Sequence, residues 1–203
     1  LNTFKQYGYM PFKTIASVSA SSMIACIALS HSEKDPDKIF QVMGMLTASE
    51  VVSYKKLIPK LVDNYRDYLP QFLGRYYRNK YQYTGGIHVL NLEKIINRFF
   101  NDELIRPSVI RKNPIELWMG VTDVETGRVE FYSSKDESVD LRDILLASAN
   151  IPGIVDYKSY INGRLKVDGG VVQPIPYEFV TQTLGFEPRD VLTISSQLVM
   201  FTS

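Results

Sequence analysis

The chain has 203 residues and a formal net charge of +1, with 45% hydrophobic and 22% charged residues. This length suffices for a sizeable buried core, and the composition is that of a folded globular chain. A near-neutral charge argues against a globally basic nucleic-acid binder. Because the chain has one cysteine, Cys26, and two histidines, His31 and His88, we exclude a disulfide framework, a cysteine-rich zinc site and a multi-histidine metal centre.

The beginning of the chain carries no recognisable targeting signal. No stretch reaches the roughly 18 apolar residues that span a bilayer, and residues 1–5 lack the basic start and apolar core of a signal peptide. Leu1, Phe4 and Tyr7 have helical spacing, so we expect that the chain opens inside a helix and that preceding residues are missing. We expect a cytoplasmic protein, and peripheral contact with membranes stays open.

The first predicted elements are a strand and two helices. Residues 14–18 form a short apolar run rich in β-branched side chains, which indicates a buried strand. A helix near residues 20–30 follows, because apolar side chains recur there at steps of three and four residues, at Met23, Ile24, Ile27 and Ala28. Asp35-Pro36 predicts the start of the next helix, with the aspartate as its cap.

Residues 54–86 are rich in tyrosine and positive charge. Seven tyrosines lie here among seven lysines and arginines, and only Asp63 and Asp67 oppose them. One interpretation is an insert or lid that meets lipid headgroups with its rings and cations. Another is single-strand nucleic-acid binding by stacking, and a third is a helical insert that buries its rings. We favour the structural insert or the lipid contact and expect no nucleic-acid partner.

The pattern beyond residue 86 predicts helices and a pair of strands. Asn91 should cap a helix whose apolar residues are Leu92, Ile95, Ile96, Phe99 and Phe100. Residues 117–124 and 129–132 read as two strands joined by Glu125-Thr126-Gly127. Asp140 should cap a further helix that buries Ile144, Leu145 and Ala149.

The last part of the chain contains the clearest hairpin signal. Residues 159–161 and 165–167 flank Asn162-Gly163, a dipeptide typical of two-residue hairpin turns. A helix near residues 177–183 and a buried strand at residues 191–194 complete the pattern. Strands that alternate with helices predict one α/β layered domain with a mixed sheet.

Ser19 is the first candidate for chemistry. It falls between the predicted strand and helix, with the small residues Ser17 and Ser21 two positions on either side. This is the layout of a nucleophile elbow, whose usual form is glycine, any residue, serine, any residue, glycine. The following helix would point its N-terminus and the Ala20 N–H at a developing oxyanion. A simple helix cap is the competing interpretation.

Asp168 is the second candidate. It ends the second strand of the predicted hairpin and is followed by Gly169-Gly170, a turn that lets other backbone approach closely. An acid at the end of a strand is a reasonable catalytic base. The competing interpretation is a turn aspartate that bonds its own backbone.

Four segments, taken in chain order, resemble the patatin-like phospholipase family. They are the elbow at residues 14–28, the strand pair at 118–131, the segment Ala147-Ser148-Ala149 followed by Pro152, and Asp168-Gly169-Gly170. Together they extend over nearly the whole chain. The resemblance implies a single domain over residues 1–203, with a central mixed, mostly parallel sheet flanked by helices.

The resemblance also implies a reaction. Members of this family cleave acyl esters of lipids through a Ser–Asp dyad and an acyl-enzyme, without a histidine. Carried over, Ser19 would be the nucleophile and Asp168 its base, acting on phospholipid or lysophospholipid esters with no cofactor and no metal. His31 and His88 are then expected to be structural or surface residues. The oligomeric state is left open.

This sequence departs from the family pattern at two places. The glycine-rich basic loop that supplies the family's oxyanion hole has no match, so we expect the chain to lack that loop and the first strand. Ser17 and Ser21 also replace both glycines of the elbow. These departures leave a second hypothesis, a catalytically impaired relative that binds lipid or acts as a scaffold.

Overall fold

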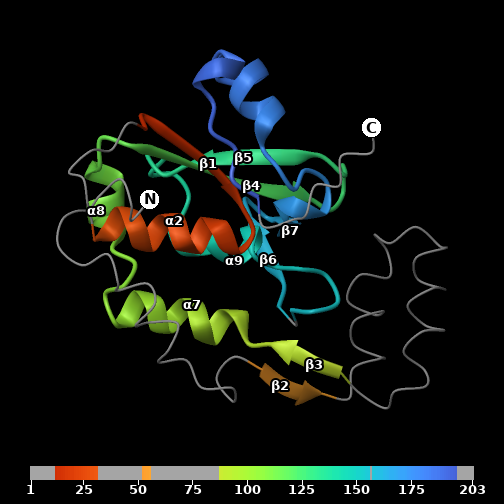
Figure 1. Ribbon diagram of the computed structural model, residues 1–203. Coiled ribbons are helices and arrows are strands. Elements are labelled where there is room, and N and C mark those ends of the chain that lie inside the picture. The colour runs from red at the N-terminus through yellow and green to blue at the C-terminus, as the bar shows by residue number, and fades with distance from the viewer. Residues whose placement is uncertain (1–11, 32–51, 56–86, 156, 196–203) are drawn as a thin grey trace.

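The computed structural model describes residues 12–31, 52–55, 87–155 and 157–195 of the chain (Figure 1). A five-stranded mixed sheet forms its centre. The strands of this sheet are β1 (Thr14–Val18), β4 (Glu116–Asp123), β5 (Val129–Ser133), β6 (Ser159–Ile161) and β7 (Arg164–Asp168). Two further strands, β2 (Val52–Lys55) and β3 (Ile87–Leu90), pair with each other in a separate antiparallel ribbon.

Strand β4 organises the sheet because three other strands pair with it. β5 pairs with one edge of β4, and β1 and β7 share the other edge. β1 runs parallel to β4 and ends with Val18 opposite Gly120. β7 runs antiparallel to β4 and ends with Asp168 opposite Val121. The carboxyl ends of β1 and β7 therefore converge from opposite directions on neighbouring residues of β4.

Helices cover the face of the sheet that holds the main core (Figure 1). α2 and α9 lie directly on the strands, α7 packs against α9, and α8 packs against α2. Their bounds are Ala20–Ser30 for α2, Leu92–Asn101 for α7, Pro107–Lys112 for α8 and Leu141–Ser148 for α9. The fully buried Leu117, Met119 and Val121 of β4 pack in this core.

Aromatic packing covers part of the opposite face. Phe179 stacks on Phe131 of β5 with ring centroids 3.8 Å apart and meets Trp118 of β4 edge-on at 5.4 Å. Phe179 opens a short π-helical segment, η2 (Phe179–Thr183), and two short 3₁₀ turns flank it in the chain, η1 (Gly169–Val171) and η3 (Pro188–Asp190). The expected helix near residues 177–183 is thus confirmed as a helical turn.

Most expected elements are found where local pattern is strong. β1 and α2 have the bounds that the apolar periodicity predicts. The Asp140 side chain accepts a hydrogen bond from the Arg142 N–H and so caps α9 as expected. Asn162 and Gly163 both have positive φ in the turn between β6 and β7, which confirms the hairpin. The α/β class with a mixed sheet flanked by helices is confirmed.

Two expectations are corrected. The central sheet is mostly antiparallel in the described part of the chain, with β1 and β4 as its one parallel pair. Tight turns join β4 to β5 and β6 to β7, and a tight turn can connect only antiparallel strands. The expected strand at residues 191–194 is wrong, because this segment pairs with no described strand and Ile194 is 80% exposed. Its apolar side chains resemble those of a buried strand, but no strand in the described part of the chain pairs with them.

Some expectations fall outside the described residues. These are the helix expected at residues 1–7, the helix predicted after Asp35-Pro36 and the tyrosine-rich segment beyond Lys55. Among the helices of the described ranges, none is long and apolar enough to cross a membrane.

Candidate active site

Ser19 occupies the sharp turn between β1 and α2. Its backbone has φ of 60° and ψ of −144°, and the side chain is partly exposed. Such a conformation is strained by about 1–3 kcal/mol for a residue with a side chain, and it persists only where the surroundings enforce it. In the described residues, only Glu103 and Asn162 share a positive φ among non-glycines. This is the turn geometry that a nucleophile elbow requires.

Asp168 is the last residue of β7 and is almost completely buried. Its N–H donates to the carbonyl of Asn150 at 3.0 Å, and its own carbonyl accepts from the Thr122 hydroxyl at 3.0 Å. Hydrogen bonds to its N–H and its carbonyl therefore fix the main chain of Asp168 independently of any contact of the carboxyl.

The structure brings Ser19 and Asp168 together. Oδ1 of the Asp168 carboxyl accepts from the Gly170 N–H at 2.7 Å, and the Ser19 side chain lies close enough to the carboxyl to lower its pKa. Oδ2 is buried, and no described residue gives it a hydrogen bond of standard geometry. Burial raises the pKa of Asp168, and the nearby Ser19 side chain and the hydrogen bond from the Gly170 N–H offset only part of this increase. A carboxylate with a raised pKa is a stronger base toward a neighbouring hydroxyl.

The two positions after Asp168 hold glycine because a side chain there would come too close to neighbouring atoms. A Cβ at Gly169 would lie 2.4 Å from the carbonyl oxygen of Gly120, and a Cβ at Gly170 would lie 3.0 Å from Asp168 Oδ1. Neither glycine has a positive φ, so close approach and not backbone freedom explains them. The chain can turn directly against β4 only because these side chains are absent.

Both serines that flank the elbow fit without strain. Ser17 is buried, and its hydroxyl lies 3.1 Å from the Ser22 hydroxyl and 3.3 Å from the Trp118 carbonyl. The Ser21 hydroxyl donates to the Val18 carbonyl at 2.5 Å. Neither serine has a positive φ, so this chain does not need glycine at these positions.

Ser148 is a site residue to which sequence reasoning gave no role. Its hydroxyl accepts from the Ser19 N–H at 3.2 Å, donates to the Gly120 carbonyl at 2.9 Å and lies 3.0 Å from the Ser22 hydroxyl. The residue is fully buried at the end of α9. The signal that could have found it is a polar residue between two alanines at the buried end of a helix.

The family model described as patatin-like phospholipase matches residues 5–181 of the chain. The protein belongs to the patatin-like phospholipase family. No curated protein matches the chain. The family is one of lipid acyl hydrolases that act on lipid ester substrates, so the described turn and carboxyl lie in a chain of a hydrolase family.

His31 lies far from the elbow of this patatin-like domain. It follows α2, whereas Ser19 precedes it, and the eleven residues of that helix separate the two by about 16 Å. Its Nε2 lies 3.1 Å from the Leu104 carbonyl, and its Nδ1 lies 3.3 Å from the Arg106 guanidinium. His31 therefore belongs to the packing at the far end of α2. His88 lies in β3, and its side chain is outside the described set.

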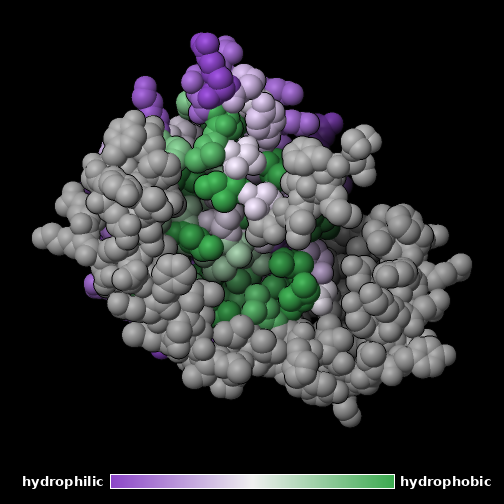
Figure 2. All heavy atoms as spheres, in the orientation of Figure 1, coloured by the Kyte–Doolittle hydropathy of each residue, from purple (hydrophilic) through white to green (hydrophobic). Residues whose placement is uncertain are grey.

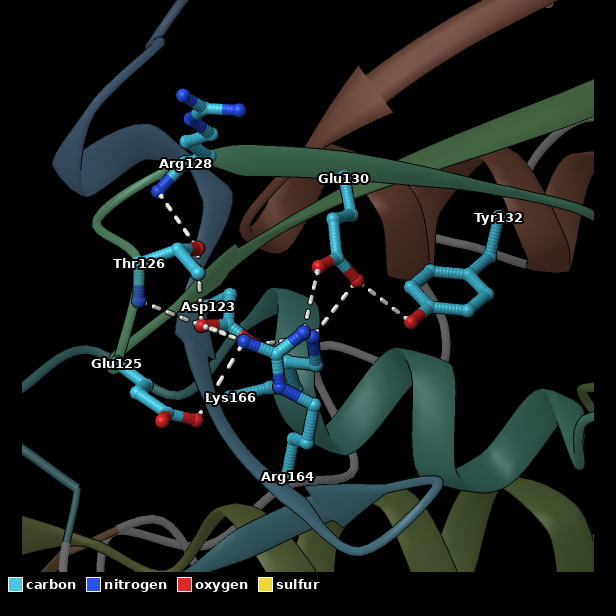
Figure 3. Close-up of polar contacts among 8 residues, drawn as sticks. All are labelled: Asp123, Glu125, Thr126, Arg128, Glu130, Tyr132, Arg164 and Lys166. Atoms are coloured by element: carbon cyan, nitrogen blue, oxygen red, sulfur yellow. Dashed lines mark hydrogen bonds and ion pairs between the residues drawn. The ribbon is translucent and has the colours of Figure 1, made fainter.

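Lys166 lies two residues before Asp168 in β7, so both side chains are on one face of that strand, and Lys166 belongs to the charged cluster drawn in Figure 3. The buried Lys166 ammonium donates to Asp123 Oδ2 at 2.7 Å and to Glu130 Oε2 at 2.6 Å. Burial alone would raise the pKa of Asp123, but hydrogen bonds from Lys166 and Thr126 outweigh it and hold this pKa at about 2. The cluster ties together β4, β5 and β7, because a buried charge is tolerated only when it is paired.

In the described ranges, no three histidine, cysteine or acidic side chains gather in a way that could hold a metal ion. The free thiol of Cys26 is buried, and burial raises its pKa. Thiols react as thiolates, so Cys26 is a packing residue.

Proposed function

We propose that this protein is a serine lipid acyl hydrolase that cleaves phospholipid or lysophospholipid esters with Ser19 and Asp168. The observation that carries the proposal is the meeting of a strained, partly exposed serine with a buried carboxyl of raised pKa. Family membership supports the class of reaction. The choice of dyad and substrate is our inference.

The reaction proceeds in two acyl transfers. Ser19 Oγ attacks the ester carbonyl carbon while its proton moves to Asp168, and a tetrahedral intermediate forms. The bond to the alcohol breaks, and the alcohol leaves with the proton from Asp168, so that the acyl group stays on Ser19. Water then attacks the acyl-enzyme while its proton moves to Asp168, the bond to Ser19 Oγ breaks, and Asp168 returns the proton to Ser19 as the free fatty acid is released.

The start of α2 supports the charge that develops on the carbonyl oxygen. α2 begins at Ala20, so the Ala20 N–H is among the first N–H groups of the helix, which have no acceptor within it. Ala20 is exposed beside Ser19. Loss of one such donor lowers the rate of acyl transfer by about 10²–10³ in enzymes of this kind of chemistry.

Exposed apolar side chains near both residues favour an acyl chain as substrate. Ile24 shares a face of α2 with Ala20, because residues four apart lie on one side of a helix. Ile24 is 47% exposed, and Val171 and Val172, just after the Asp168 turn, are 55% and 51% exposed. Figure 2 shows apolar side chains gathered in the middle of the face in view. An acyl chain that covers Ile24, Val171 and Val172 would lie close in the chain to both Ser19 and Asp168.

The decisive experiment combines labelling with hydrolysis. The complete protein should react with a fluorophosphonate probe and hydrolyse phosphatidylcholine vesicles, and Ser19→Ala and Asp168→Asn should each abolish hydrolysis without unfolding the chain. Matched controls are Ser138→Ala and Asp102→Asn, which change the same chemical groups at exposed sites away from the dyad. Full hydrolysis by either dyad variant would refute the proposal.

A second candidate is a catalytically impaired patatin-like protein that binds lipid or acts as a scaffold. It is favoured by the serines at positions 17 and 21, where the family carries glycine. We also propose peripheral membrane contact by a cytoplasmic protein. A chain that floats with phosphatidylserine vesicles but does not react with the probe would support the second candidate over the first.

A further inference from the structure

We propose that Ser148 is a positioning residue that holds the main chain of Ser19 in its reactive conformation. This inference rests on the proposed function, because it assigns a role in acylation to a residue that touches no reacting atom. Ser148 is the last residue of α9, and its hydroxyl connects this helix end to the elbow and to the middle of β4.

The Ser148 hydroxyl uses its one donor and both of its acceptor positions. A serine hydroxyl has one hydrogen to donate and two lone pairs that accept. The hydrogen goes to the Gly120 carbonyl at 2.9 Å, and one lone pair accepts the Ser19 N–H at 3.2 Å. The contact with Ser22 at 3.0 Å must then have Ser22 as donor, which uses the second lone pair. The hydroxyl is satisfied in all directions and fully buried.

The bond to Ser19 acts on the strained residue itself. A backbone conformation such as that of Ser19 persists only when its surroundings over-determine it. The Ser19 N–H is the group whose direction changes when φ and ψ relax, and its acceptor is Ser148 Oγ. Without that acceptor, the partly buried Ser19 N–H would lose its hydrogen-bond partner, and the strained turn would relax more easily.

The same chain segment also holds the base. The carbonyl of Asn150, two residues after Ser148, accepts the N–H of Asp168 at 3.0 Å. The Asn150 side chain in turn donates to the Tyr157 carbonyl at 3.1 Å. Residues 148–150 therefore bind the main chains of both Ser19 and Asp168, so this segment sets the separation of the two residues.

Ser22 and Ser159 are matched controls. Ser22 is as deeply buried as Ser148, and its hydroxyl contacts the Ser148 hydroxyl. The Ser22 hydroxyl does not accept the Ser19 N–H. The Ser159 hydroxyl is buried and has no hydrogen-bond partner in the described part of the chain. If Ser148 acts only through packing or stability, Ser22→Ala should resemble Ser148→Ala.

The experiment measures the rate of fluorophosphonate labelling, kcat and KM on a phospholipid substrate, and thermal stability for the complete protein. We expect Ser148→Ala to slow labelling and lower kcat by about 10- to 100-fold with little change in KM, because small misplacements of a reacting group have effects of this size. Ser22→Ala should lose similar stability but slow labelling by less than about threefold, and Ser159→Ala should label at the wild-type rate.

Each outcome decides the matter. Wild-type labelling by Ser148→Ala, or an equal loss in Ser22→Ala, overturns the positioning role. If Ser148→Ala does not fold, Ser148→Cys keeps the shape of the side chain with a slightly larger atom that bonds more weakly, and a wild-type rate in that variant overturns the role as well. A wild-type protein that is not labelled at Ser19 refutes the proposed function itself, whereas a labelled wild type with an unaffected Ser148→Ala refutes only the positioning role.

Discussion

Gly169 lies directly against the carbonyl group of Gly120. That carbonyl also accepts the hydrogen bond from Ser148, whose hydroxyl holds the Ser19 N–H. One peptide unit of β4 thus touches the turn after Asp168 and, through one hydroxyl, the turn at Ser19. Since β1 and β7 both end at this point of β4, the sheet and residues 148–150 together set the distance between the two turns.

The first prediction concerns Gly169→Ala. The added Cβ would lie 2.4 Å from a backbone oxygen, which cannot move without shifting β4. Overpacking of this kind destabilises proteins by about 1–3 kcal/mol. We expect a loss of that size in chemical denaturation and a loss of ester hydrolysis greater than the lost stability explains.

Gly170→Ala provides the comparison for this variant. Its Cβ would meet the Asp168 carboxyl at 3.0 Å and no backbone atom within 4 Å. We expect a smaller loss of stability than for Gly169→Ala, together with lower activity, because the displaced group is the carboxyl itself. Equal stability losses in the two glycine variants would contradict the proposed role of the Gly120 contact.

The second prediction is the pH dependence of acylation. Asp168 accepts a proton only when it is ionised, and burial raises the pKa of its carboxyl although the nearby Ser19 side chain and the Gly170 N–H lower it. The labelling rate should therefore fall as pH decreases through a pKa above the ordinary value of an aspartate. The rate of fluorophosphonate labelling, measured against pH, gives this pKa directly. A fall in rate centred on the ordinary pKa of an aspartate would contradict the prediction.

Stability should change with pH in the opposite sense at the same residue. A carboxyl whose pKa is raised in the folded state stabilises the fold below its unfolded pKa, and this contribution is lost as pH rises through the folded pKa. Asp168→Asn cannot ionise, so its stability should not fall as pH rises through this pKa. We expect Asp168→Asn to equal or exceed the wild type in thermal stability at neutral pH, and its advantage to shrink in acid.

Local pattern predicted those parts of the fold whose side-chain periodicity is clear. The bounds of β1 and α2 follow from short-range spacing. Ser19 and Asp168 lie close together because β1 and β7 pair with neighbouring residues of β4. No local sequence pattern predicts this register. The pairing of the two residues was predicted only through the resemblance to a family. Ser148 was missed as a contact because it lies 129 residues from Ser19 in the chain.

Two other features show why the remainder could not be predicted. Lys166 lies in a short strand where a lysine normally faces solvent, and its burial depends on Asp123 and Glu130 from two other strands. The apolar residues 191–194 have the composition of a strand but find no partner among the described strands. In both cases the outcome depends on tertiary neighbours and not on the segment.

The third prediction tests the Lys166 cluster. Lys166→Met keeps the length of the side chain but removes the charge that pairs with the buried Asp123. Breaking a buried pair by removing one partner costs about 3–5 kcal/mol. We expect a loss of that size in urea denaturation at neutral pH.

The pH dependence of this loss follows from the pKa of Asp123. Hydrogen bonds from Lys166 and Thr126 overcome the effect of burial and lower this pKa from 3.8 to about 2. A lowered pKa contributes stability above the unfolded value, and the contribution is lost as pH falls through the folded value. The difference between wild type and Lys166→Met should shrink between about pH 4 and pH 2. Arg164→Met is the comparison, because Arg164 pairs with the same Asp123 carboxyl from a side chain that is 42% exposed, so its removal should cost less than that of the buried Lys166.

The fourth prediction concerns the exposed apolar side chains beside the dyad. If Ile24 and Val171 contact the acyl chain, Ile24→Ser and Val171→Ser should weaken the use of long-chain esters but leave short-chain esters unaffected. Each exposed side chain can bury an area worth about 1.5–3 kcal/mol when fully covered, and partial cover predicts about a 3- to 30-fold rise in KM for the long chain. Tyr160→Ser is the control, because Tyr160 is 51% exposed on the face of the β6–β7 hairpin opposite Asp168. An equal rise in KM for short and long esters, or the same rise in the Tyr160 variant, would remove these residues from the acyl-chain surface.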